Sequence, residues 1–409
     1  MKGWIVVAMV AVACSSRAPA PASAPPARAT ELERAPDAEL GKRVDAVIDQ
    51  ALGAQKIVGT VVLIARDGKL VYARAAGHAD REAKLAMRED TQFRLASMTK
   101  PIVSAAALAL VDRKQLALED PVTKYLPDFQ PKLADGTTPV ITVRHLITHT
   151  SGLGYTFLEP AGGPYHTAKV SSGLAEPGLP AAANLRRLAS APLWFAPGTK
   201  WQYGLSIDVL GEVIARAAGR PLPDVVGELV TRPLAMTSTT FTVTDRARLA
   251  WPYGAGKRPA RMTEPYTLAM DDLRVTFSPA RIFDPASFPS GGAGMAGTAS
   301  DYLRFLEAIR TGGAPILAPA TAAAMHANQI DQLEADILGP GQRFGFGFGV
   351  ITDATAEPSA RGTGSFGWGG IYGTDFWVDP EAKLSVVVMT NTAGDTGFTS
   401  KLEQAIYAR

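Results

Sequence analysis

The alternation of apolar and polar positions predicts strands near both ends of the chain, with a helix beside each set. Apolar residues recur every three or four positions from Leu40 to Leu52, which is the pattern of an amphipathic helix. Residues 57–77 read as two strands joined at Asp67-Gly68, a dipeptide that favours a tight hairpin turn. Residues 343–391 contain short runs rich in Val, Phe and Trp, and residues 398–408 have helical spacing again.

The middle of the chain has the spacing of helices. Residues 101–116 read as a buried helix, apolar up to Val111 except for Ser104, while 206–219 and 298–313 each place apolar residues on one face. Because the strands come from the two ends, we expect one antiparallel sheet with the helical middle inserted between its halves. The expected fold is α/β plus all-α: an antiparallel sheet flanked by helices, with a sheet domain of residues 38–115 and 335–409 and an inserted helical domain of 116–334.

The first residues have the features of an export signal. Lys2 precedes a short apolar run, residues 4–13, which is too short to span a bilayer as a helix. Cys14 follows directly, and the arrangement resembles a bacterial lipoprotein signal, although alanine replaces the leucine usual three positions earlier. We expect residues 1–14 to be an export signal with lipidation of Cys14. Plain signal cleavage just before the cysteine is the alternative.

Composition narrows the class of protein. Residues 15–37, rich in Ala, Pro and Ser, are typical of a semi-extended tether, so we expect an exported, cell-envelope or periplasmic protein anchored to the membrane. The 409 residues carry a formal net charge of only +2, which gives no electrostatic case for binding nucleic acid. The single cysteine excludes an intramolecular disulfide.

A serine and a lysine stand three residues apart just before the helix of residues 101–116. Positions i and i+3 share a helix face, so Lys100 could take the Ser97 proton and make this serine a nucleophile. A helix cap followed by an ordinary helix residue would give the same pattern. Two more stretches favour the interpretation of Ser97 and Lys100 as a catalytic pair. Tyr203 lies in a Pro- and Gly-marked loop before a helix, and Trp368-Gly369-Gly370 lies in a strand, where glycine often marks close approach of a ligand.

These three stretches, in this order, resemble the serine hydrolase superfamily of penicillin-binding proteins and class C β-lactamases. Within that superfamily the likeness is greatest to the family VIII esterases. Four more blocks are similar to the same family, at residues 116–129, 141–153, 291–306 and 368–391. The resemblance implies a β-lactamase/transpeptidase-like fold with the active site in the cleft between the sheet and the helices.

The resemblance also implies a role for each motif residue. Ser97 would be the nucleophile, Lys100 its basic partner, and Tyr203 the group that relays the proton to the leaving group. The backbone N–H groups of Ser97 and Ile371 would form the oxyanion hole, since preset donors stabilise charge that develops in the transition state. Residues 368–370 would occupy the place of the family's Lys-Thr-Gly strand.

Two departures from the family pattern favour esters over β-lactams. Class C β-lactamases are expected to have Tyr-x-Asn, but the third position here is Leu205, and Trp368 replaces the strand lysine. Without that lysine an anionic substrate loses a charge-assisted hydrogen bond, typically worth ~1.5–3 kcal/mol. We therefore expect Trp368, Gly369, Gly370 and Leu205 to bind a small neutral ester or acyl compound, which is cleaved through an acyl-Ser97 intermediate.

Two other interpretations stay open. The same residues could serve a β-lactamase, or a D-alanyl carboxypeptidase or D-aminopeptidase acting on cell-wall-like substrates. The chain could also be a cell-wall-binding lipoprotein that does not turn over its ligand.

The remaining short patterns are interpreted as structural. His145 and His149 are four apart, as two metal ligands on one helix face would be. However, Leu146 stands where a zincin has glutamate, and no third ligand is evident. Residues 310–312, Arg-Thr-Gly, mimic the Lys-Thr-Gly motif but end a predicted helix. We expect neither a metal nor a cofactor.

Overall fold

The structure, a computed structural model, describes Met1 and residues 32–408 except 271–272 and 357–358. The predicted export signal, Cys14 and most of the predicted tether lie outside the described residues. The last tether residues already belong to the folded unit, because the Ala35 N–H donates to the Leu70 carbonyl at 3.0 Å. None of the helices in the described ranges is long and apolar enough to cross a membrane.

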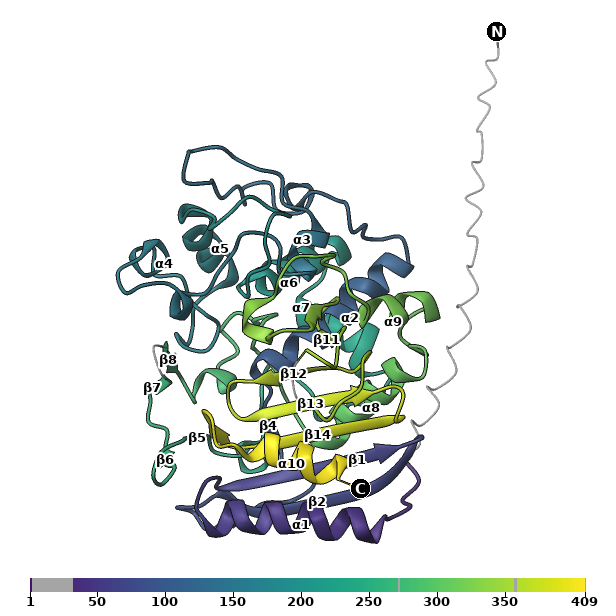
Figure 1. Cartoon of the computed structure of the whole chain (residues 1–409). Helices are drawn as coiled ribbons and strands as arrows, with labels where there is room; N and C mark the ends of the chain where they lie inside the picture. The colour runs from purple at the N-terminus through teal and green to yellow at the C-terminus, as the bar shows by residue number, and fades with distance from the viewer. Residues whose placement is uncertain (2–31, 271–272, 357–358, 409) are drawn as a thin grey trace.

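One eight-stranded antiparallel sheet joins the two ends of the chain, as the sequence predicted (Figure 1). Its first hairpin turns at Asp67-Gly68, where both residues have positive φ, and β1 pairs on its other side with the last long strand, Val62 facing Val388. In spatial order the strands are β10 (Gln342–Phe344), β11 (Gly349–Ile351), β12 (Phe366–Gly370), β13 (Thr374–Asp379), β14 (Leu384–Thr390), β1 (Gly59–Arg66), β2 (Lys69–Asp80) and β3 (Leu85–Ala86).

The two terminal helices cover one face of this sheet (Figure 1). α1 (Ala38–Gly53) begins at Asp37, whose side chain accepts the Leu40 N–H, and its buried stripe packs on the sheet. α10 (Phe398–Tyr407) lies beside α1 and buries Phe398, Leu402 and Ile406 in the same cluster. Both helices match the periodicity of the sequence.

The opposite face is covered by α2 (Thr99–Asp112) and α8 (Ala299–Arg310). α2 is buried from Thr99 to Leu110, which explains why its sequence is apolar on all sides. α8 packs on β14 and β1, where Ser385 Oγ donates to Glu307 at 2.6 Å. Because α8 comes from the segment predicted as the helical insertion, part of that segment packs on the sheet. The division of the chain at 116 and 334 stays a prediction.

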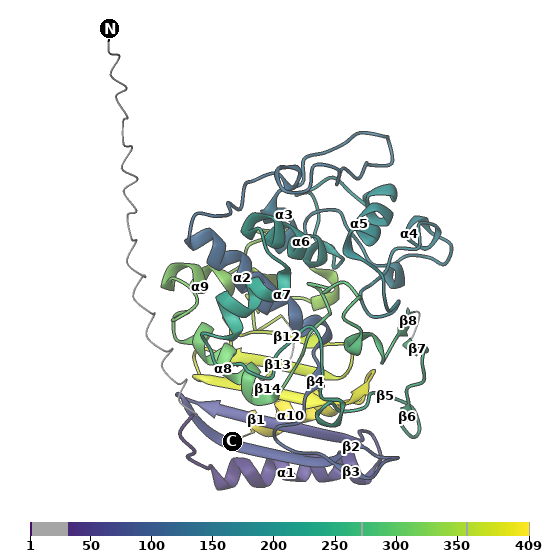
Figure 2. The same cartoon turned by 180° about the vertical axis from the view of Figure 1, so that it is seen from behind.

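Most of the remaining helices gather beyond α2 and form the other wall of the molecule (Figure 2). They are α3 (Val143–Ile147), α4 (Pro164–Thr167), α5 (Ala181–Ser190), α6 (Ser206–Ala218) and α7 (Leu222–Val226), while α9 (Pro319–Met325) packs beside α2 and α8. Small strand pairs tie the loops between them: β4 (Phe93–Arg94) with β9 (Ala296–Gly297), β5 (Tyr253–Gly254) with β6 (Ala260–Arg261) and β15 (Thr392–Ala393), and β7 (Tyr266–Met270) with β8 (Leu273–Phe277).

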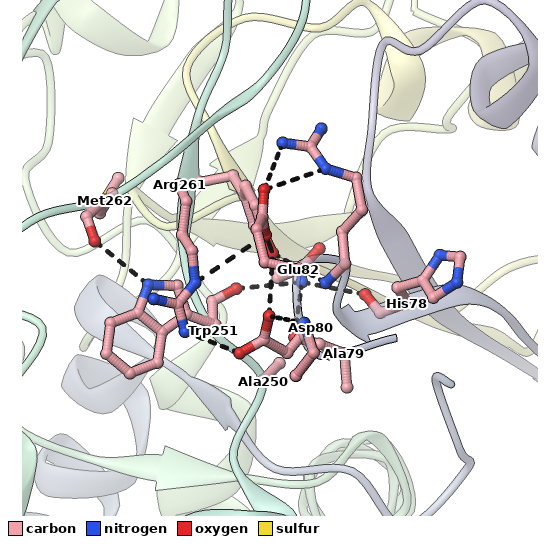
Figure 3. A network of polar contacts seen from close by, with 12 residues as sticks. His78, Ala79, Asp80, Glu82, Ala250, Trp251, Arg261 and Met262 are labelled. Atoms are coloured by element: carbon pink, nitrogen blue, oxygen red, sulfur yellow. Dashed lines mark hydrogen bonds and ion pairs between the residues drawn. The ribbon is translucent and has the colours of Figure 1, made fainter. Parts of the chain in front are cut away.

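A polar network fastens the loop that carries β5 and β6 to the end of β2 (Figure 3). Arg261 donates to Asp80 at 2.7 Å and lies over the ring of Trp251. Asn391, at the end of β14, donates to the carbonyl oxygens of His78 and Trp251 at 3.2 and 3.0 Å. These contacts join segments far apart in sequence, and they anchor the loop beside the sheet.

Candidate active site

Ser97 lies at a strained turn between β4 and α2. The residue before it, Ala96, has a φ of 44° and is fully buried. Such a left-handed conformation is costly for alanine and persists only where the surroundings hold it. Here Leu95 is held on both sides, since its N–H donates to Met295 at 2.9 Å and its carbonyl accepts from the Thr374 hydroxyl at 3.3 Å. The turn therefore presents Ser97 in a fixed position.

Gly370 lets β12 approach this turn closely. A Cβ at residue 370 would lie 2.2 Å from the carbonyl oxygen of Leu95, so only glycine fits. The glycine of the strand motif thus serves the approach of another backbone segment, one of the two reasons for glycine inside a strand. As a result, the end of β12 and Ile371 lie beside Ser97, and both residues line one cavity.

Two side chains, those of Lys100 and Tyr203, converge on Ser97. Lys100 Nζ lies 3.1 Å from Ser97 Oγ and 2.7 Å from the Tyr203 hydroxyl, while that hydroxyl lies 2.5 Å from Ser97 Oγ. Lys100 is fully buried and also donates to the carbonyl oxygen of Gly292 at 2.8 Å. The structure thus brings the predicted trio together and adds a fourth contact that the motifs did not indicate.

Aromatic and imidazole rings fix the Tyr203 side chain. Its ring lies 5.4 Å from Trp368 and 5.2 Å from both His149 and Tyr155, measured between centroids. His149 accepts the Gly204 N–H through Nδ1 at 3.3 Å. Burial and the charge of Lys100 hold the pKa of His149 well below its usual value, so this imidazole is neutral. His149 therefore acts as a positioning group beside Tyr203.

The two histidines of the possible metal pattern do not share a site. His145 caps α3, where its Nδ1 accepts the Thr142 N–H at 3.2 Å, whereas His149 packs beside Tyr203. Within the described part of the chain, no group of three or more His, Cys, Asp or Glu side chains is arranged to hold a metal ion.

A buried carboxyl supports the loop that contacts Lys100. Asp208, in the first turn of α6, accepts a hydrogen bond from Ser290 Oγ at 2.5 Å. Its other oxygen lies where a Cβ on residue 292 would fall, 2.4 Å away. Burial raises the pKa of Asp208, and hydrogen bonding to Ser290 and the charge of Lys100 oppose that rise. The sequence analysis missed Asp208. The signal that could have revealed it is an acidic residue among the buried positions of a helix.

The three residues Ser97, Lys100 and Tyr203 (the catalytic trio of the sequence prediction) lie at a cavity of about 490 Å³. Of the predicted residues, Ser97, Tyr203, Trp368, Gly369 and Ile371 line it, whereas Lys100 is fully buried behind it and Gly370 lines a neighbouring cavity. Leu205 is fully buried in the core where α6 begins and is outside the lining, so the structure does not bring it to a substrate. The other lining residues include aromatic and aliphatic ones, namely Tyr155, Phe157, Leu174, Ile337, Leu338, Ile351 and Phe366. They also include the polar residues Ser172, Arg361 and Asp375.

Comparisons with known proteins agree on the kind of fold and site. A family model described as Beta-lactamase matches residues 44–408. Esterase EstB of Burkholderia gladioli is 48% identical over 379 residues, which cover 91% of this chain and 96% of that protein. The solved structure of EstCE1, a hydrolase with promiscuous acyltransferase activity, superposes with a TM-score of 0.88 at 42% identity, covering 91% of this chain and 99% of that one. Unliganded simvastatin synthase (LovD) from Aspergillus terreus has a TM-score of 0.69 at 24% identity, over 91% of this chain and 99% of that one, and shows the fold alone.

Proposed function

The chain belongs to the beta-lactamase family and is an enzyme of its esterase and acyltransferase kind, and we propose that it cleaves esters through an acyl intermediate on Ser97. One observation carries this proposal. Ser97 Oγ lies within hydrogen-bond distance of both Lys100 Nζ and the Tyr203 hydroxyl, at a cavity large enough for a small ester. The printed names of EstB and EstCE1, an esterase and a hydrolase, support the same reaction class.

The proposed reaction has two halves. In the first, Lys100 acts as the base that takes the Ser97 proton, Oγ bonds to the ester carbonyl carbon, and the N–H groups of Ser97 and Ile371 hold the oxyanion. Tyr203 passes the proton to the alkoxy oxygen as its bond to the carbonyl carbon breaks, so the alcohol leaves neutral. In the second half, water gives its proton to the Lys100–Tyr203 pair as its oxygen bonds to the acyl-Ser97 carbon. The bond from that carbon to Ser97 Oγ then breaks, Oγ takes the proton back from the pair, and the acid is released.

The cavity favours a neutral ester over an anionic β-lactam. Trp368 stands on the strand where the family has lysine, and its indole packs against Tyr203 at 5.4 Å. Aromatic and aliphatic side chains line the cavity together with polar ones, and the guanidinium of Arg361, which also lines it, is paired with Glu403 at 2.8 Å. An anionic substrate would therefore lose the charge-assisted partner that a lysine beside Tyr203 would supply.

Hydrolysis of p-nitrophenyl butyrate tests the proposal. We expect Ser97→Ala to lower kcat/KM by at least about a thousandfold, because nucleophile and base act as a unit. Ser172→Ala, which removes another hydroxyl from the same cavity, is the matched control and should retain most of the activity. Mass spectrometry of the trapped enzyme should place the acyl group on Ser97. Full activity of Ser97→Ala would overturn the proposal, and faster turnover of β-lactams than of short esters would favour the β-lactamase alternative.

We further propose that Cys14 carries a lipid that anchors the exported enzyme to the cell envelope. The support is the sequence alone: a short apolar run, then the one cysteine, then an Ala- and Pro-rich tether. In a bacterial host, the full chain should fractionate with membranes and Cys14→Ser should not. Equal release of both into the soluble envelope fraction would leave plain signal cleavage as the explanation.

A further inference from the structure

Two arginines line a small cavity next to the active-site cavity. This cavity has a volume of about 20 Å³, and nearly all of the residues around it are buried. Arg94 reaches it from β4, and Arg281 reaches it from the turn after β8. Leu174 and Ala293 line both cavities, so the two share a wall. We call the smaller one the arginine cavity.

Both arginines are buried, and neither forms an ion pair within the described residues. Arg94 is 6% exposed and Arg281 is 7% exposed. Arg94 donates to the carbonyl oxygens of Ala250 at 2.9 Å and Pro279 at 2.6 Å. Arg281 donates to the carbonyl oxygen of Phe288 at 2.6 Å. These bonds use some of the N–H groups but bring no negative charge, although a buried arginine is rare unless it is paired.

The acidic side chains nearest in charge to the two guanidinium groups have other partners. They are Glu176, Asp208, Glu264 and Asp284. Each of them accepts a hydrogen bond from, or forms an ion pair with, a different group. Since no carboxyl lines the arginine cavity, two buried positive charges face it without a counter-charge.

Three buried donor atoms on the residues of this cavity have no hydrogen-bond partner among the described residues. They are Nε of Arg94, Nε of Arg281 and Oγ of Ser278. Buried polar groups almost always have a partner, so three such atoms around one cavity indicate a ligand. All three can donate a hydrogen bond, and two carry positive charge, so the ligand that fits is an anion. Water would accept the hydrogen bonds but leave both charges uncompensated.

The charge and size of the cavity restrict the kind of anion. Burial lowers the pKa of Arg94 to about 10 and also lowers the pKa of Arg281, which shows the cost of desolvating both groups. With a pKa of about 10, Arg94 still carries its charge at neutral pH. The volume exceeds the roughly 10–15 Å³ that one water molecule needs, so a monatomic anion fits and a large organic anion does not.

We propose that the arginine cavity binds a small monovalent anion, such as chloride, between Arg94, Arg281 and Ser278. Arg94 lies three residues before Ser97, and Tyr372, which lines the same cavity, directly follows Ile371. A bound anion therefore holds together the two segments that carry the proposed oxyanion donors. The inference does not rest on the proposed ester hydrolysis, because its readouts are stability and ion binding.

Thermal unfolding in chloride and in gluconate tests the inference. Sodium chloride is exchanged for sodium gluconate, whose anion is too large for the cavity, at a constant ionic strength of about 0.2 M. We expect the wild-type Tm to rise with chloride along a saturable curve by about 2–5 °C. This is the shift for a ligand that binds only the folded state and is present at roughly ten- to a hundredfold its Kd.

Three variants identify the site. Ser278→Ala removes a hydroxyl that has no partner among the described residues, so the fold should persist while the chloride concentration at half of the shift rises about tenfold. Arg281→Gln should abolish the shift, and Ser278→Ala carries the test if Arg281→Gln does not fold. Arg258→Gln removes the same charge at an exposed residue outside the cavity and should keep the wild-type curve.

Crystals grown in bromide give a direct measurement that needs no variant. Anomalous difference density should appear between Arg94 and Arg281, and its absence from the cavity would overturn the inference. Equal Tm values in chloride and gluconate would show that water fills the cavity and would overturn it as well. So would a chloride shift that Ser278→Ala and Arg281→Gln both retain in full.

Discussion

The hydroxyl of Tyr203 lies 2.5 Å from Ser97 Oγ, and Lys100 Nζ contacts both oxygens. The phenol is therefore placed to act on the oxygen of the nucleophile and on a leaving group bound next to it. Since Lys100 is fully buried and touches both hydroxyls, a proton can pass among the three groups without leaving the site.

Tyr203→Phe should remove the proton relay and leave the packing. The ring contacts with His149, Tyr155 and Trp368 remain in phenylalanine, so the fold should keep its stability. We expect kcat on p-nitrophenyl butyrate to fall by roughly a hundred- to ten-thousandfold, the usual worth of a general acid–base group, with KM changed far less. Steady-state kinetics and thermal unfolding check this. A KM effect of the same size as the kcat effect would contradict the relay.

Trp368→Lys should shift selectivity toward anionic substrates. The new ammonium would stand beside Tyr203, where the family has its strand lysine, and a charge-assisted contact to a carboxylate is typically worth roughly ten- to a hundredfold in binding. We expect acylation by nitrocefin to rise relative to hydrolysis of p-nitrophenyl butyrate. Trp368→Met, which removes the indole without adding charge, is the control. Equal shifts in both variants would show that space, and not charge, sets the preference.

Leu205→Ala should affect stability and leave substrate preference unchanged. Leu205 is fully buried where α6 begins and lies outside the cavity lining, so its truncation leaves a core cavity, which typically costs about 2–5 kcal/mol. Urea unfolding should show this loss, and the ratio of rates on acetyl and octanoyl esters should stay at the wild-type value. A changed ratio with normal stability would restore the substrate-binding role expected from the sequence.

How much of the site the sequence predicts depends on how local each contact is. Ser97, Lys100 and Tyr203 stand next to element boundaries that periodicity and glycine reveal, so motif order was enough to select them. Leu205 follows Tyr203 by two positions, but α6 begins immediately after it and directs its side chain into the core. Asp208 accepts its hydrogen bond from Ser290, which lies 82 residues away in sequence, and no local sequence pattern predicts a contact between such distant residues.

The sheet was predictable for a similar reason. The hairpin at Asp67-Gly68 carries a turn signal in its own residues, and strands rich in Val mark the opposite end of the chain. The placement of α8 on the sheet was not, because a helix with one apolar face packs equally well on a sheet or on other helices. Its tertiary contacts with β14 and β1, among them the hydrogen bond from Ser385 to Glu307, show that it packs on the sheet.

Stability should fall on acidification because of His149. Burial holds the pKa of this residue well below 6.5, so the folded state stays neutral there while the unfolded chain takes up a proton. Stability is therefore complete above about pH 6.5 and is lost below it, by at most about 1.4 kcal/mol per pH unit for one group. The drop in unfolding free energy between about pH 7 and pH 5.5 should be smaller in His149→Gln. His166→Gln, at an exposed position, should retain the full drop.

Gly292→Ala should impair catalysis without touching the trio directly. A Cβ at this position would lie 2.4 Å from the Asp208 carboxyl, which is held by Ser290, so the backbone of residue 292 must move. That movement withdraws the carbonyl oxygen that accepts from Lys100 Nζ at 2.8 Å and leaves the ammonium less firmly placed. We expect kcat to fall by at least about tenfold with KM changed less, since misplacement of a catalytic group acts on the chemical step.

Gly256→Ala is the matched control for this change. It makes the same substitution at an exposed position, where the nearest atom to the new Cβ is the backbone oxygen of Arg258 at 3.6 Å, so activity should be retained. Asp208→Ala tests whether the Asp208 carboxyl supports the loop that carries Gly292. If it does, this variant should also lower kcat. The double variant with Gly292→Ala should then lose less activation free energy than the sum of the losses in the two single variants. Full activity of Gly292→Ala would show that the Gly292 carbonyl does not position Lys100.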